Sequence, residues 1–293
     1  MSILNRMFTL RDGRKLGYDE HGPSVGRPVF YFYGTPSARV EWEFCGSEEL
    51  VNKLGLRIIA VDRPGMGLSD FQPGRHFCDW AADVAALADG LGLERFSVLG
   101  FSGGTPYALA CALKIPERLA SVGLVGIEAP YTLPGITQDI NYQSLQFLEL
   151  NRDNPWLARL IQATMYLTAR LAPDRLITQS LSALPEPDQA ALKQPKVQKV
   201  FIHMIRESMR RGTLGPQVDT ALMVSAWDFN PADIQVPVQM WQGEKDMDAP
   251  PVMARYISST VPHSKITFYP DKGHLSVMLV WFLVASISMI VKQ

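Results

Sequence analysis

The stretch FSVLGFSGGTPY, residues 96–107, decides the fold that we expect for this chain. A short apolar run ends at Gly100-Phe101-Ser102-Gly103-Gly104, and an Ala- and Leu-rich segment follows directly. This is GxSxG between a predicted strand and a predicted helix, the context of a nucleophile elbow. Glycines two residues before and two after the serine leave room for a strained turn, because they carry no side chain. Ser102 is therefore a candidate nucleophile.

Composition excludes several kinds of partner and site. The 293 residues are 47% hydrophobic, enough for a large α/β core that carries an insertion. The net charge of −1, without a Lys/Arg cluster, argues against nucleic-acid binding. Cys45, Cys78 and Cys111 are an odd number without CxxC spacing, which favours neither a disulfide framework nor a zinc site. An N-terminus without an apolar signal segment then favours a cytoplasmic protein.

The C-terminal segment is unusually apolar. From Leu275 to Val291 there is no charged residue, a run just short of the length that spans a bilayer. We expect a helix packed on the core. The alternative is a contact with a membrane surface or with a second copy.

Apolar runs along the chain predict alternating strands and helices. Asp12-Gly13 lies between two short alternating segments, which is a hairpin signal. Continuous apolar runs that end in Gly- and Pro-rich loops are typical of strands buried on both faces. The predicted strands are 29–33, 56–61, the run before Ser102, 121–127, 236–241 and 265–269, and the predicted helices include 42–54, 80–91 with Asp79 as N-cap, and 251–259. This order predicts a mostly parallel, doubly wound sheet.

The alternation stops between two of these strands. From about residue 130 to 224 apolar residues recur at helical spacing, interrupted by prolines, and no run resembles a strand. We therefore predict a core formed by 1–129 and 225–293, with a helical cap inserted at 130–224.

A nucleophilic serine needs a histidine base. His274 follows the last predicted strand in PDKGHLS, at the sheet edge where ligands gather in open α/β folds. It is the candidate base. The other four histidines, which we expect to be ordinary surface or hydrogen-bonded residues, are His21, His76, His203 and His263.

The carboxylate that orients the base should lie between serine and histidine in the sequence. Asp246, in GEKDMDAP after a predicted strand, fits this position. Asp248 and Glu128 are alternatives. For the oxyanion we expect two backbone donors, the amides of Gly103 and Thr35, since Pro36 has no N–H to donate.

Together these motifs resemble the α/β-hydrolase fold superfamily, and the resemblance covers nearly the whole chain. The motifs are YGTP (33–36), DRPGMGLSD (62–70), GFSGG (100–104), GEKD (243–246) and GH (273–274). They look like the esterase and lipase-like branch with a helical cap. The resemblance implies a serine hydrolase that cleaves an ester-like bond of a small molecule, without cofactor or metal. One departure is Tyr33, where many relatives carry His, which implies a different pocket shape.

Several relatives with other activities share this motif set. Serine at position 102 disfavours the haloalkane dehalogenase and epoxide hydrolase branches, which use aspartate there. Haloperoxidase or perhydrolase relatives, carbon–carbon bond hydrolases and proline iminopeptidases remain alternatives, as do a ligand sensor that retains the triad and a membrane-associated lipid hydrolase. An iminopeptidase would need an acidic clamp, for which the candidates are Glu149, Asp153 and Glu207.

Aromatic and Met side chains near these motifs are candidates for a substrate pocket. In the core they are Tyr33, Phe101, Trp227 and Phe229, and in the predicted cap Phe147, Trp156, Met165, Tyr166, Phe201 and Met204. The same cap residues fit a helical core equally well.

Overall fold

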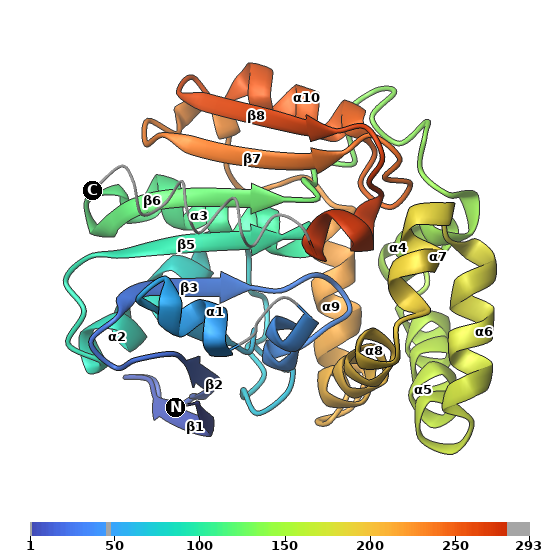
Figure 1. Ribbon diagram of the computed structural model, residues 1–293, viewed down its shortest axis with the longest axis horizontal. Helices are drawn as coiled ribbons and strands as arrows, with labels where there is room; N and C mark the ends of the chain where they lie inside the picture. The colour runs from blue at the N-terminus through green and yellow to red at the C-terminus, as the bar shows by residue number, and fades with distance from the viewer. Residues whose placement is uncertain (1, 45–47, 280–293) are drawn as a thin grey trace.

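An eight-stranded sheet lies at the centre of the computed structural model, which describes residues 2–44 and 48–279 (Figure 1). The strand order is β1-β2-β4-β3-β5-β6-β7-β8. Strand β2 is antiparallel to both of its neighbours, and the other neighbouring strands are parallel. The predicted mostly parallel α/β sheet is therefore confirmed. The strands are β1 (Ile3–Thr9), β2 (Lys15–His21), β3 (Arg27–Phe32), β4 (Leu56–Val61), β5 (Phe96–Phe101), β6 (Leu119–Val125), β7 (Val238–Gly243) and β8 (Ser264–Tyr269).

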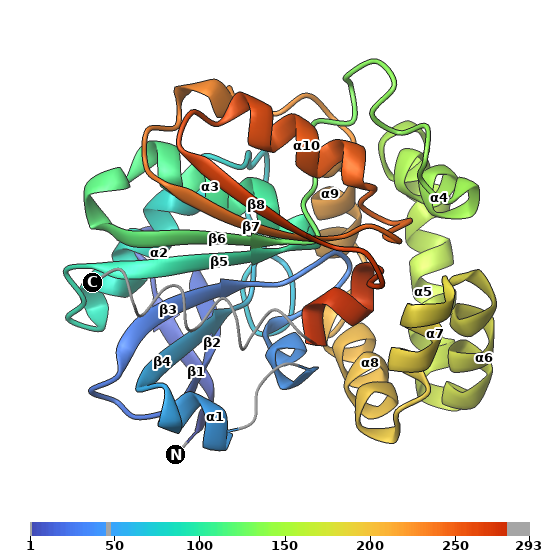
Figure 2. The same cartoon turned by 45° about the horizontal axis from the view of Figure 1, so that its top comes forward.

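Helices cover both faces of the sheet, as its apolar strands require (Figure 2). On one face, Trp80, Leu109 and Met253 of three helices belong to one hydrophobic cluster with the strands. On the other face, Val51 and Met278 belong to a second cluster. All six residues of β5 are buried, so this strand is enclosed on both sides. The core helices are α1 (Glu48–Lys53), α2 (Asp79–Gly90), α3 (Thr105–Lys114) and α10 (Pro251–Thr260).

Two predicted helices differ from the structure at their ends. The range 42–54 holds the end of a 3₁₀ helix, Arg39–Phe44, and then the short α1. In α2, Asp79 is the first helical residue and Cys78 stands at the N-cap. The Asp79 carboxylate accepts a hydrogen bond of 2.7 Å from the backbone N–H of His76, outside the helix. It therefore closes the preceding turn instead of capping the helix.

Two sequence predictions involve residues outside the described ranges. Residues 274–279 are helical, but most of the apolar segment 275–291 falls outside. Across 2–44 and 48–279, no helix is long and apolar enough to cross a bilayer. Cys45 also lies outside, whereas Cys78 and Cys111 are free thiols.

Six α-helices stand between β6 and β7 and lie beyond the carboxyl ends of the parallel strands (Figures 1 and 2). Pro155, Pro173 and Pro195 each occupy the first position of a helix. These prolines begin helices instead of interrupting them, because the first helical N–H needs no partner within the helix. The inserted helices are α4 (Tyr142–Asp153), α5 (Pro155–Leu171), α6 (Pro173–Ala183), α7 (Glu186–Leu192), α8 (Pro195–Ser208) and α9 (Leu214–Met223).

Buried ion pairs join two of the inserted helices to the core. Asp219 of α9 lies 2.7 Å from both Arg63 and Arg75, and all three side chains are at most 2% exposed. Glu207 of α8 lies 2.8 Å from Arg39. Removing one partner of a buried pair leaves an uncompensated charge in a poorly solvated place. The loops after β3 and β4, which carry these arginines, are therefore firmly attached to α8 and α9.

A contact between two glycines brings α9 still closer to the loop after β4. A Cβ atom on Gly215 would lie only 2.1 Å from the carbonyl oxygen of Gly65. Since the clash is with backbone, any side chain at position 215 would push the helix away from the loop. This close approach places α9 next to the Arg63 guanidinium.

Candidate active site

The turn at Ser102 has the geometry of an elbow. Strand β5 ends at Phe101, a short 3₁₀ turn covers Ser102–Gly104, and α3 follows at once. Ser102 has φ of 51°, which costs a non-glycine residue about 1–3 kcal/mol. A Cβ atom on Gly100 would lie 2.6 Å from the Gly104 carbonyl oxygen, and one on Gly104 would lie 2.1 Å from that of Phe32. Both glycines are therefore needed for the chain to turn here.

The candidate base and acid are hydrogen bonded to each other. His274 Nδ1 lies 2.8 Å from Asp246 Oδ2, and the Asp246 carboxylate is fully buried. With a carboxylate at Nδ1, that nitrogen carries the proton and Nε2 is left to accept one. Of the three acids proposed from the sequence, Asp246 is the one that meets the imidazole.

The Asp246 carboxylate is itself held by a set of donors. The backbone N–H groups of Asp248 and Ala249 donate to Oδ1 at 3.0 and 2.8 Å. The side-chain amide of Gln242, at the end of β7, donates to Oδ2 at 3.0 Å. Because every one of these donors belongs to β7 or to the loop after it, the carboxylate has one fixed orientation toward His274.

Nearby carboxyl groups shift the titration of the base. Burial lowers the pKa of His274, but Asp246 and then Asp248 and Glu128 raise it, and the net result lies above the ordinary histidine value. Burial also raises the pKa of Glu128 to about 8. Burial raises the pKa of Asp248 as well. His274 therefore holds its proton more tightly than an exposed histidine.

Ser102 and His274 line one cavity of about 290 Å³ between the sheet and the inserted helices. Among the described residues, Ser102 and His274 are not hydrogen bonded to each other. The distance between a catalytic serine and its base is often long before substrate binds. Most of the wall is apolar. The apolar lining consists of Phe44, Phe101, Phe147, Leu148, Met165, Leu184, Phe201, Met204, Ile205, Met223, Leu275 and Met278.

Of the four pocket residues predicted in the core, only Phe101 lines this cavity, with its ring 4.9 Å from the His274 ring. Tyr33 is fully buried elsewhere, and its hydroxyl accepts a 2.6 Å hydrogen bond from the Arg63 backbone N–H. Trp227 packs on Phe77 and Phe229, with ring centroids 5.9 and 5.3 Å apart. Tyr33 is therefore a core residue, Trp227 and Phe229 pack against the core, and none of the three lines the cavity, contrary to the prediction.

Four of the six cap candidates line the cavity. They are Phe147, Met165, Phe201 and Met204. Trp156 instead is 72% exposed. Its α5 and the neighbouring helices offer apolar residues on more than one side, so helical spacing alone does not identify the inward face.

The segment 33–36 carries the predicted oxyanion donor Thr35 and is called the oxyanion loop below; it lies against the elbow. A Cβ atom on Gly34 would lie 3.3 Å from Cβ of Ser102, and one on Gly103 would lie 2.4 Å from Thr35 Oγ1. The two predicted oxyanion donors therefore belong to adjoining segments. The N–H of Gly34 already donates to the buried Glu41 carboxylate at 2.9 Å. The Gly34 amide is therefore occupied, and the predicted donor from this loop remains the amide of Thr35.

Sequence reasoning missed the residues that hold the oxyanion loop. Arg63 donates to the carbonyl oxygen of Tyr33, to that of Gly34 at 2.8 Å, and to Thr35 Oγ1 at 2.7 Å. The Thr35 hydroxyl in turn donates to Asp219 Oδ2 at 2.8 Å. Arg63 was visible in DRPGMGLSD, but Asp219, within the helical insertion, carried no local signal.

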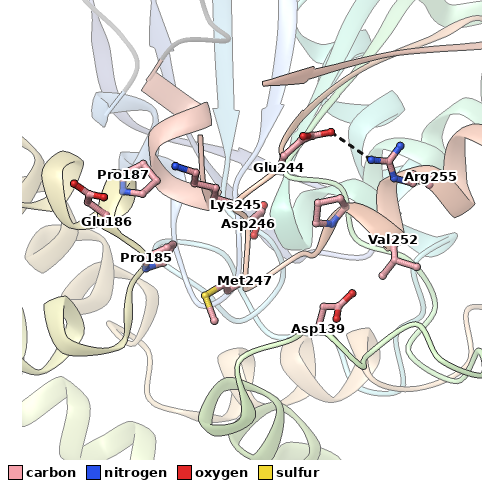
Figure 3. A pocket seen from close by; sticks show the side chains of 11 residues that line it. Asp139, Pro185, Glu186, Pro187, Glu244, Lys245, Asp246, Met247, Val252 and Arg255 are labelled. Atoms are coloured by element: carbon pink, nitrogen blue, oxygen red, sulfur yellow. Dashed lines mark hydrogen bonds and ion pairs between the residues drawn. The ribbon is translucent and has the colours of Figure 1, made fainter. Parts of the chain in front are cut away.

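A second hollow, of about 630 Å³, lies beside the loop 244–249 (Figure 3). Glu244 and Arg255 pair across part of it at 3.3 Å. Neither Ser102 nor His274 lines it, so it is not the candidate active site. Within residues 2–44 and 48–279, no cluster of His, Cys, Asp and Glu is arranged to hold a metal ion.

Comparison with known proteins groups the chain with one family. The family described as alpha/beta hydrolase fold matches residues 27–279. A non-heme chloroperoxidase from Streptomyces lividans is 36% identical over 126 residues, 42% of this chain and 44% of that protein. A 2-hydroxy-6-oxononadienedioate/2-hydroxy-6-oxononatrienedioate hydrolase from Pseudomonas putida is 24% identical over 280 residues, 92% of this chain and 90% of that protein.

A solved structure has the same architecture over almost its full length. A thermophilic esterase from Thermogutta terrifontis superimposes with a TM-score of 0.69 at 24% identity, covering 98% of this chain and 97% of that one. The first curated relatives are matched over less than half of their own length. The family match, by contrast, extends from β3 through the helical residues 274–279. The chain belongs to the α/β-hydrolase fold family.

Proposed function

We propose that this protein is a serine hydrolase that cleaves a carboxylic ester, or a related acyl bond, of a small apolar substrate. One observation carries the proposal. Ser102, held at positive φ on the elbow, shares a cavity with His274, whose Nδ1 is hydrogen bonded to the buried Asp246. A nucleophile, a base and a group that orients the base are the parts that acyl transfer requires.

The reaction proceeds through an acyl-enzyme. Ser102 Oγ attacks the carbonyl carbon while Nε2 of His274 accepts its proton. The imidazolium then gives that proton to the leaving alkoxide, and the ester C–O bond breaks. Water, deprotonated by the same imidazole, attacks the acyl carbon. The bond to Ser102 Oγ then breaks, the imidazolium returns its proton to that oxygen, and the acid leaves. Asp246 keeps the ring orientation through both steps and stabilises the imidazolium.

The tetrahedral intermediates carry a negative oxygen that needs fixed donors. The amides of Gly103 and Thr35 serve this role in the proposal, and it is supported by the contact between the elbow and the oxyanion loop. Arg63 contributes indirectly, since it binds the carbonyl oxygens of Tyr33 and Gly34 and so keeps the loop in place.

The inserted helices, for which we propose the limits 130–224, act as a cap that selects the acyl group. Helices α4, α5, α8 and α9 contribute apolar residues to the cavity roof. A volume of about 290 Å³ is at the small end for ligand pockets. The cap therefore favours a short acyl chain.

A panel of p-nitrophenyl esters tests this selection. We expect kcat/KM to be highest for acetate or butyrate and to fall about tenfold or more for laurate, because the longer chain exceeds a cavity of about 290 Å³. Replacing Phe201 by Ala enlarges the cavity under the inserted helices. In this variant kcat/KM for the octanoate ester should rise relative to kcat/KM for the butyrate ester. An unchanged ranking in this variant would count against the cap as the selector.

Product in large excess over protein also distinguishes an enzyme from a sensor that retains its ligand.

The raised pKa of His274 predicts how activity depends on pH. The base works only when deprotonated, so kcat/KM should rise with pH, with a midpoint above the value near 6.5 of an unperturbed histidine. Asp246→Asn removes the main charge that raises this pKa, so the midpoint should move down, and the plateau should fall because the imidazole loses its orientation.

Glu128→Gln is the matched control for that profile. Glu128 also raises the pKa of His274 and lines the same cavity, but it does not bond to the ring. Its replacement should therefore lower the midpoint, and it should lower the plateau far less than Asp246→Asn does. The measurement is kcat/KM for p-nitrophenyl acetate against pH for the three proteins. A flat wild-type profile, or an upward shift in Asp246→Asn, is the result that this account does not allow.

A further inference from the structure

A carboxylate from the inserted helices binds the backbone of the candidate base. Asp188 lies in α7 and is completely buried. Its Oδ2 accepts a hydrogen bond of 2.8 Å from the N–H of His274. Its Oδ1 accepts one of 2.8 Å from the N–H of Ser276. Both oxygens of one side chain are thus used on the first turn of the segment that carries the imidazole.

The packing around this carboxylate leaves the base loop, residues 270–274, little freedom. A Cβ atom on Gly273 would lie 2.4 Å from Asp188 Oδ2, so only glycine allows the carboxylate to approach. The N–H of Gly273 donates to Ser276 Oγ at 2.8 Å. On the opposite side, a Cβ atom on Gly243 would lie 2.4 Å from the carbonyl oxygen of Lys272. The base loop is therefore held between the end of β7 and α7.

The start of α7 also lies next to the loop that carries the acid. Figure 3 shows the second hollow, beside the loop 244–249, with Pro185, Glu186 and Pro187 on one side and Lys245–Met247 on the other. Asp188 follows this proline-flanked start directly, so its backbone is set by the first turn of α7. One short helix of the insertion thus stands beside both the acid loop and the base loop.

We propose that Asp188 is a positioning residue for His274. Its carboxylate fixes the backbone N–H groups of His274 and Ser276, and this keeps the imidazole on Asp246 and directed into the Ser102 cavity. The inference rests on the proposed role of His274 as the base. It makes the inserted helices part of the catalytic geometry as well as the cavity roof, because the base is in place only when α7 is docked.

The source of this carboxylate distinguishes it from an ordinary cap. A helix begins with N–H groups that lack partners within the helix, and a nearby Asn, Asp, Ser or Thr usually satisfies them. Asn141 does this locally for α4, accepting from Gln143 and Ser144. For the His274 segment the acceptor is 86 residues away in sequence. Movement of α7 would therefore release the base directly, whereas a local cap would move with its own helix.

The test compares Asp188→Ala and Asp188→Ser with Asp188→Asn in the full-length protein. We expect kcat for p-nitrophenyl acetate to fall about 10- to 100-fold in the Ala variant, since a small displacement of a catalytic group has effects of this size. KM should change little, because Asp188 does not line the cavity. Asp188→Asn should be intermediate, since its amide oxygen still accepts one of the two bonds.

Asn154→Ala is the matched control, because it removes an N-cap of α5 within the same insertion but away from the cavity. It should leave kcat unchanged. Hydrogen exchange at the amides of His274 and Ser276 provides a second readout, and we expect it to accelerate in Asp188→Ala and Asp188→Ser but not in Asn154→Ala. A merely structural role would not single out these two amides.

Each outcome bears on a distinct claim. Folded Asp188→Ala or Asp188→Ser with wild-type kcat, or with wild-type exchange at both amides, overturns the positioning role. If the Ala variant does not fold, the closer isostere Asp188→Asn is used instead. Wild-type kcat together with wild-type hydrogen exchange at the His274 and Ser276 amides in Asp188→Asn also overturns the positioning role. Labelling of the wild-type protein by a fluorophosphonate is measured first. If Ser102 is not labelled, the proposed function fails, and this result does not depend on any Asp188 variant.

Discussion

Replacing Ser102 by Ala is expected to lower turnover of p-nitrophenyl acetate by about 10⁴- to 10⁶-fold. The hydroxyl is the only group at the elbow that forms the covalent intermediate in the proposed mechanism, so no neighbouring side chain compensates. Labelling by a fluorophosphonate probe should disappear in the same variant. Kinetics together with mass spectrometry of the labelled protein would measure both effects.

Ser97→Ala is the matched control for this experiment. Ser97 lies on the same strand, β5, where it accepts a 2.8 Å hydrogen bond from Ser121, and it does not line the cavity. We expect full labelling and nearly full turnover in this variant. Retained hydrolysis or labelling in Ser102→Ala would remove Ser102 as the nucleophile, whatever the fate of the control.

Replacing Asp219 by Ala should give the largest loss of stability, about 3–5 kcal/mol in the free energy of unfolding. The change leaves Arg63 and Arg75 buried without their shared carboxylate. It also removes the acceptor of the Thr35 hydroxyl, so the oxyanion loop should loosen and kcat should fall in whatever fraction stays folded. Denaturant unfolding followed by tryptophan fluorescence would measure the loss.

Asp153→Ala is the control for the Asp219 experiment, because Asp153 forms an exposed ion pair with Arg152. Exposed pairs contribute little, so this variant should unfold at nearly the wild-type denaturant concentration. A similar small effect in Asp219→Ala would contradict the role assigned to the buried pairs.

The Asp219 pairs also set a pH limit on stability. Burial alone would raise the pKa of Asp219, but Arg63 and Arg75 hold it below the ordinary aspartate value. A carboxylate with a depressed pKa in the folded state stabilises the protein above its unfolded pKa, near 3.9, and this contribution is lost as the pH falls through the folded value. The contribution of these pairs should therefore be constant near neutral pH and disappear only in strong acid.

The sequence was most informative where function depends on local chain geometry. The elbow could be predicted because a buried strand, a tight turn and a helix follow one another within residues 96–107, and because Gly100 and Gly104 are needed by backbone contacts nearby. Strand β4 was predicted with its observed limits, 56–61, because its continuous apolar run ends directly at the DRPGMGLSD loop. The sheet followed from the order of such runs.

Contacts between distant parts of the chain could not be predicted in the same way. Asp219 and Asp188 lie in helices of the insertion and meet partners far away in sequence, at Arg63 and His274. No local pattern separates these aspartates from solvated ones such as Asp153. A buried carboxylate is recognised by its donors, and the donors are known only once the chain is folded.

The direction of a side chain was equally hidden. Tyr33 stands where many relatives of the resembled family carry His, and this difference suggested a role in the pocket. Its hydroxyl lies instead at the Arg63 backbone, and the guanidinium of Arg63 stacks 4.1 Å from the ring centre. Such a partner removes an aromatic residue from the cavity without any change in the motif around it.

For protein engineering, the glycine contact between Gly215 and Gly65 limits what can be exchanged. A chimaera that took all the inserted helices from another protein would need to reproduce a backbone approach that tolerates no Cβ atom, along with the acceptor for two arginines. The natural graft boundary therefore lies before α9. A new specificity could be transplanted as α4–α8, provided that the donor supplies an aspartate in the place of Asp188 and a carboxylate in the place of Glu207, the partner of Arg39.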